Sequence, residues 1–215
     1  SSAASDVYKR QSTLFAYYPW QEGGDIPAEF SVKADQSGDN YTASDLIVAV
    51  KAGVKPTLSS TQMTFKHKMS RIVIDVTNES GFDITNIVIK GAVGTGVLDP
   101  ATGNFTAKAD AEASDLIANT ATANKVYYAL LVPQNGVKLM VTVTTADGKK
   151  RTQTLGTADF KSGENRRMEC NVQPADIEVK FSGPITGWVD GDDLLPDGEG
   201  EVETPTVEWG GVKYE

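Results

Sequence analysis

The chain has 215 residues, 40% of them hydrophobic, and a formal net charge of −9 at pH 7. This length allows one large all-β domain or two small ones, and it suffices to bury most of the apolar surface without disulfides. The sequence contains no basic patch for nucleic acid, no run of about 20 apolar residues that could cross a membrane, and no HExxH, CxxC or P-loop motif.

Residues 1–11 are polar and contain a basic pair, Lys9-Arg10. The stretch Ser5-Asp-Val-Tyr-Lys-Arg-Gln11 is similar to translated sequencing linkers in metagenomic reads, so we expect a non-native segment here. The alternative is a genuine basic processing site at Arg10.

An aromatic strand is predicted over residues 12–18, where Pro19 ends it. The apolar run Leu46–Val50 is either a buried strand or one helical turn, and periodicity does not decide between them. Gly53 and Pro56 indicate a connector over residues 51–60, where we place a domain boundary.

A strand with a change of phase runs from Met63 to Thr77. In the first half of this strand, one face carries Phe65, His67 and Met69. In the second half, the opposite face carries Ile72, Ile74 and Val76. A straight strand cannot place both sets in one core, because a slip of one residue reverses every side chain. We expect a bulge near Ser70 and Arg71, or a strand that passes from one packed layer into another.

Short apolar strands alternate with turn signals from residue 84 to residue 189, a pattern typical of Greek-key sandwiches. Residues 125–132 are apolar on both faces and predict a central strand. The sequence Ala146-Asp147-Gly148 predicts a hairpin. Small polar residues over 109–124 predict a loop with a helical turn, and Trp188 is expected to be a large core anchor.

The C-terminal stretch carries most of the net charge. From residue 190 onward there are nine acids and one lysine, a balance of −8 that leaves about −1 for the rest of the chain. We interpret residues 191–215 as an acidic linker followed by a strand or hairpin around Gly210-Gly211. A calcium loop at Asp190-Gly-Asp-Asp193 is the alternative, although the spaced ligands of an EF-hand are missing. An isolated hairpin is marginal in water, so this one needs a sheet edge or groove.

Few residues could carry chemistry. The single histidine, His67, lies on an apolar strand face, and we expect a hydrogen-bonded core residue rather than part of a catalytic triad. The single cysteine, Cys170, alternates with apolar residues and is expected to be a small core hydrophobe. Tyr17, Tyr18 and Trp20 could stack on sugars, although one of the two tyrosines must face inward. We therefore expect no catalytic, cofactor or metal site and no enzymatic activity.

Seven segments, in order between Thr13 and Asp190, resemble the fimbrillin-like proteins, the subunits of type V pili on the surface of Gram-negative anaerobes. The matching segments are Phe15-Ala-Tyr-Tyr-Pro19, Asp35-Gln-Ser37, Ser44-Asp-Leu46, Phe65-Lys-His-Lys-Met-Ser-Arg-Ile-Val-Ile74, Leu131-Val-Pro133, Gly163 to Val172 and Ile185-Thr-Gly-Trp188.

The resemblance implies an all-β fold of two transthyretin-like Greek-key β-sandwich domains, the first incomplete. Residues 12–60 would be the remnant of the N-terminal domain and residues 61–190 the C-terminal domain. It also implies export as a lipoprotein, trimming after an arginine, and a location at the outer membrane in a fimbrium. Two features depart from the family: the lipidation cysteine is absent, and neither Arg10 nor Arg71 is an obvious trimming site.

The resemblance further implies assembly with other pilus subunits by strand exchange, in which a donor strand completes a neighbour's sheet. We expect Val207, Trp209, Val212 and Tyr214 to be the side chains of such a donor, because they alternate beyond the acidic linker. The alternative is that this tail packs on its own domain. A carbohydrate-binding surface module with a host or microbial receptor is the second hypothesis, and a glycosidase with two facing carboxylates is the third.

Overall fold

The computed structural model describes residues 12–20, 26–54, 62–188 and 212–214. Over these ranges the protein is almost entirely β-structure, with a single short helix, α2 (Asp39–Ala43). The all-β prediction is confirmed, whereas the transthyretin-like topology remains a prediction. No helix in the described part is both long and apolar enough to cross a membrane.

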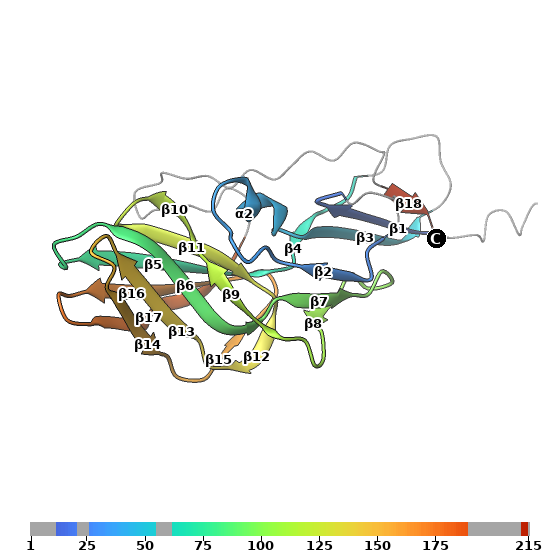
Figure 1. Cartoon of the computed structure of the whole chain (residues 1–215). Coiled ribbons are helices and arrows are strands. Elements are labelled where there is room, and N and C mark those ends of the chain that lie inside the picture. Colours follow the sequence, from blue (N-terminus) through green and yellow to red (C-terminus); the bar gives the residue numbers. More distant parts are fainter. Residues whose placement is uncertain (1–11, 21–25, 55–61, 189–211, 215) are drawn as a thin grey trace, which may run out of the picture.

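The larger half of the molecule, at the left of Figure 1, contains two sheets that enclose a shared core. The first sheet has the order β10–β11–β5–β16–β17. Its strands are β10 (Asn119–Thr122), β11 (Val126–Leu131), β5 (Ser70–Asn78), β16 (Glu164–Val172) and β17 (Ile177–Gly187). The pair β5–β16 is parallel, and the other pairs in this sheet are antiparallel.

The opposing sheet has the order β14–β13–β6–β9 and is antiparallel throughout. Its strands are β14 (Lys150–Thr154), β13 (Met140–Thr145), β6 (Ile84–Val93) and β9 (Ala113–Ile117). Alternate residues of β13, including Val141 and Val143, face the core, as the period of two predicts. The predicted hairpin at Gly148 is confirmed, since it joins β13 to β14.

Three small sheets occupy the rest of the molecule. The strands β18 (Val212–Tyr214), β1 (Ser12–Tyr18), β3 (Ile47–Val54) and β4 (Lys66–His67) form one sheet in that order. The strands β2 (Glu29–Ser31), β7 (Thr95–Leu98) and β8 (Phe105–Ala107) form the second, and β12 (Gln134–Val137) pairs with β15 (Ala158–Phe160) in the third. Figure 1 shows the first two at the end of the molecule opposite the large sheets.

The change of phase in the central stretch is a change of sheet. Residues Lys66–His67 form β4 beside β3, whereas Ser70–Asn78 form β5 between β11 and β16. The second of the two expectations is therefore confirmed, because β5 pairs in regular register from Ser70 onward and has no bulge there.

Two local expectations have opposite outcomes. Of the run Leu46–Val50, residues 47–50 belong to strand β3 and none to a helical turn. The prediction of a loop with a helical turn over 109–124 is wrong, because β9 and β10 lie there. These strands are short and mostly exposed, with Leu116 the one fully buried side chain of β9, so they show little apolar periodicity.

Most of the buried apolar side chains form one continuous cluster that extends from Phe15 to Trp188. The predicted connector over 51–60 is wrong in its first part, because residues 51–54 belong to strand β3. The antiparallel pair β2–β7 joins strands from the two sides of this boundary. The division into two domains there remains a prediction. Cys170 is fully buried, as expected for a core residue, and burial raises the pKa of its thiol to about 12.

Candidate functional site

A buried polar cluster lies where β4, β5 and the end of β17 meet. His67 Nδ1 is 2.9 Å from Asp45 Oδ1, and the His67 ring stacks on the Trp188 indole with centroids 3.8 Å apart and planes inclined by 16°. All three side chains are buried. The prediction of a hydrogen-bonded core histidine is confirmed, as is the prediction that Trp188 is a core anchor.

A fully buried arginine on β5 also lies against the Trp188 indole. Arg71 donates from Nε to Asn165 Oδ1 at 2.8 Å, and its guanidinium carbon is 4.8 Å from the Trp188 ring centroid, a cation–π distance. Burial raises the pKa of the Tyr41 hydroxyl, and the nearby charge of Arg71 opposes that rise. A protease could not reach Arg71 in this fold, because no part of its side chain is exposed.

Asp45, which contacts His67, follows closely after the end of helix α2. Ser44 is the C-cap residue of helix α2, and its hydroxyl donates to the Asn40 carbonyl and accepts the Lys33 N–H, both at 2.8 Å. The chain then turns so that Asp45 follows directly beside β4. The segments Ser44-Asp-Leu46, Phe65–Ile74 and Ile185–Trp188 thus meet in one place, although they are far apart in sequence.

A buried glutamine ties the segment before α2 to the large sheet. The Gln36 amide donates to the Leu130 carbonyl at 2.9 Å and accepts the Leu130 N–H at 2.7 Å, so it pairs with the strand as a neighbouring strand would. Asp35 accepts bonds from the Ser37 backbone N–H and hydroxyl, which lower the pKa of its carboxyl group. No local pattern in the sequence indicates this role of Gln36.

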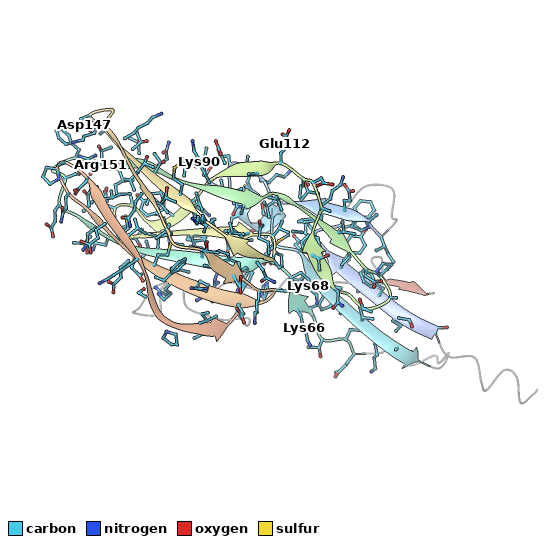
Figure 2. All side chains as sticks on the ribbon, turned by 90° about the horizontal axis from the view of Figure 1, so that it is seen from below. Lys66, Lys68, Lys90, Glu112, Asp147 and Arg151 are labelled. Atoms are coloured by element: carbon cyan, nitrogen blue, oxygen red, sulfur yellow. The ribbon has the colours of Figure 1, made fainter. Side chains whose placement is uncertain are left out.

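A groove of about 900 Å³ opens above the cluster. One wall is β4 with its flanking residues, from Thr64 to Lys68, and the other is the start of β8, from Asn104 to Thr106; Trp188 closes the floor. Figure 2 shows Lys66 and Lys68 close together where the two halves of the molecule meet. Sequence reasoning missed this groove, because segments separated by tens of residues build it.

The three aromatic residues that could stack on sugars differ in exposure, and one of the two tyrosines faces inward, as expected. Tyr17 is buried in the core and Tyr18 is half-buried, whereas Trp20 is 56% exposed. None of the three lines the groove. Among the residues that the structure describes, no group of three or more His, Cys, Asp or Glu side chains could hold a metal ion. The calcium-loop alternative at 190–193 lies outside the described residues.

The predicted donor side chains are only partly covered by the structure. Val207 and Trp209 lie outside the described residues. Val212 and Tyr214 are the first and last residues of β18. The backbone of this strand pairs antiparallel with β1 of the same chain, with Tyr214 opposite Leu14 and Val212 opposite Ala16. Within the described residues, β18 forms the outer edge of its sheet.

Comparison with known proteins agrees with this architecture. The model of a family described as fimbrillin-like matches residues 7–188. The chain therefore belongs to the fimbrillin-like family. No curated protein matches it.

Solved structures share the fold. A putative cell adhesion protein from Bacteroides ovatus superimposes with a TM-score of 0.68 at 22% identity, over 85% of this chain and 69% of that one. A putative cell adhesion protein from Bacteroides uniformis gives a TM-score of 0.65 at 16% identity, over 83% of this chain and 74% of that one. A fimbrial protein from Bacteroides vulgatus gives 0.50 at 15% identity, over 81% and 77% of the two chains. Membership of this family supports a non-enzymatic role for the chain as a fimbrial protein at the cell surface.

Proposed function

We propose that this chain is a structural or adhesive subunit of a cell-surface fimbria, a type V pilus, and that its C-terminal strand joins neighbouring subunits by strand exchange. Family membership supports the first part of the proposal. The observation that supports the second part is the position of β18, a C-terminal strand that lies on the edge of β1 near the start of the described chain.

The acceptor in this proposal is the edge of β1. Leu14, Phe15 and Ala16 are buried core residues of β1, and their backbone is paired with β3 on one side and β18 on the other. Removing β18 leaves that second edge with unpaired N–H and C=O groups, which another strand can bind. Either the C-terminal strand of the same chain or that of a neighbouring subunit can pair with these three residues in the same register.

Chain length permits either arrangement. Residues 189–211 separate the last described residue of the main body, Trp188, from β18. Twenty-four backbone steps of ~3.3–3.6 Å span at most about 79–86 Å, more than the length of a small domain. A strand connected in this way can be exchanged between identical copies without a change in its contacts, as in domain swapping.

Equal-length deletions test the proposal. We expect removal of residues 206–215 to abolish polymers seen by light scattering and electron microscopy, because the donor strand is lost. Removal of residues 191–200 is the matched control, since it takes out ten residues of the acidic stretch and keeps the strand; it should still polymerise. Normal polymers from the first variant would refute strand exchange through this tail.

Several finer features belong to the same proposal. We propose that residues 12–60 and 61–190 are the two sandwich units, that the protein is exported as a lipoprotein, and that it resides at the outer membrane. Limited proteolysis tests the first of these, because a domain boundary predicts preferential cleavage between residues 51 and 60. Cleavage elsewhere, with 51–60 resistant, would contradict the division.

A further inference from the structure

We propose that the groove between β4 and β8 binds acidic carbohydrate, that is, sugar chains bearing carboxylate or sulfate groups. The site is distinct from the β1 edge, so it adds a ligand to the proposed fimbrial function and does not depend on strand exchange.

The charge of the groove is the first argument. Lys66 and Lys68 lie two residues apart on and beside β4, and both line the groove, whereas no Asp or Glu lines it. Within the described part of the chain, neither lysine has an ion-pair partner. The groove is therefore locally cationic on a protein whose net charge is −9.

The two lysines also repel each other. Partial burial of Lys68 and the neighbouring charge of Lys66 both lower the pKa of the Lys68 amine. A bound carboxylate or sulfate would offset this repulsion, since an opposite charge within about 4–6 Å favours the charged amine.

The composition of the walls favours a sugar as the carrier of that negative charge. Exposed side chains with neutral hydrogen-bonding groups, Thr64, Asn104 and Thr106, form the rim and suit sugar hydroxyls. Two buried aromatic side chains, Phe105 and Trp188, also line the groove and add apolar surface to it. The volume, about 900 Å³, falls within the ~300–1,000 Å³ typical of ligand sites.

An acidic peptide fits the groove less well. A peptide that adds as a strand needs a row of free backbone groups, but β4 is two residues long and β8 three. The Lys68 carbonyl already accepts the Ser162 hydroxyl at 2.9 Å, and its N–H donates to Leu46 at 2.9 Å. At the base, Gly163 bonds to both Met69 and Trp188 through its backbone. Little backbone is left for a strand to pair with.

Titration calorimetry on the full chain tests this site with four probes: a galacturonic acid hexamer, a sulfated heparin hexasaccharide, neutral maltohexaose and a hexaglutamate peptide. We expect binding of at least one acidic saccharide, weakened by added salt, and no binding of maltohexaose. The carboxylated and sulfated probes show which acidic group the site takes, and binding of either supports the proposal.

Two double variants locate the binding. Lys66→Gln with Lys68→Gln should weaken the acidic saccharide about tenfold or more, because two nearby charges are lost. Lys125→Gln with Lys150→Gln removes two exposed lysines elsewhere and should leave the affinity unchanged. Thermal unfolding of both variants checks that each is folded. The proposal is overturned if neither acidic saccharide binds, if hexaglutamate alone binds, or if both double variants bind equally.

Discussion

Replacing Trp188 with alanine tests the buried cluster, because this indole contacts both His67 and Arg71. The side chain is 3% exposed, stacks on His67 and lies beside the Arg71 guanidinium. Truncating a buried Trp costs about 3–5 kcal/mol, so we expect the free energy of unfolding to fall by about 4 kcal/mol. For a chain of this length each kcal/mol shifts Tm by about 2–4 °C, which predicts a decrease of about 8–16 °C.

The matched control is the same substitution at an exposed tryptophan. Trp20 is 56% exposed, so Trp20→Ala should change the unfolding free energy by less than about 0.5 kcal/mol. Differential scanning calorimetry gives Tm for both variants, and urea titration gives the free energies. If Trp188→Ala melted within 2 °C of Trp20→Ala, the indole would not support this junction, and the reasoning about the cluster would be refuted.

Three further predictions concern single positions. Gln36→Ala leaves a backbone N–H and C=O of β11 without partners, so urea titration should show a loss of about 2–4 kcal/mol; an unchanged midpoint would contradict this. Gly91→Ala should destabilise the fold more than Gly148→Ala: both have positive φ, but a Cβ on Gly91 would meet a backbone carbonyl, whereas a Cβ on Gly148 meets open space. The Cys170 thiol should resist thiol reagents at pH 8 until urea unfolds the protein. Because its folded pKa, about 12, exceeds the unfolded value of 9.0, its contribution to stability is complete below pH 9 and is lost as pH rises toward 12, a loss that Cys170→Ala should reduce.

The sequence could predict features that depend on local alternation. The two phases of the central stretch predicted either a bulge or a passage between layers, and the chain does leave one sheet at His67 and enter another at Ser70. The hairpin at Gly148 and the burial of Cys170 likewise follow from patterns within a few residues.

Features that depend on distant partners were not predictable in this way. Strands β9 and β10 are short and have a single buried side chain, Leu116, so their pairing with β6 and β11 rather than local periodicity determines them. The Gln36–Leu130 pair spans 94 residues, so nothing near Gln36 indicates its role. The groove beside Lys66 and Lys68 needs segments from four parts of the chain.

Disulfide cross-linking between two single-cysteine chains tests strand exchange most directly. Ala16 and Val212 are opposite each other in the β1–β18 register, and such pairs have Cβ atoms about 4.5–5.5 Å apart, close to disulfide distance. In a Cys170→Ala background, one preparation carries Ala16→Cys and the other Val212→Cys, and the two are mixed under polymerising conditions. A preparation with Thr142→Cys, on β13 of another sheet, replaces Ala16→Cys as the control. We predict a covalent dimer from the first mixture and none from the control; polymers that form without that dimer would contradict exchange at the β1 edge.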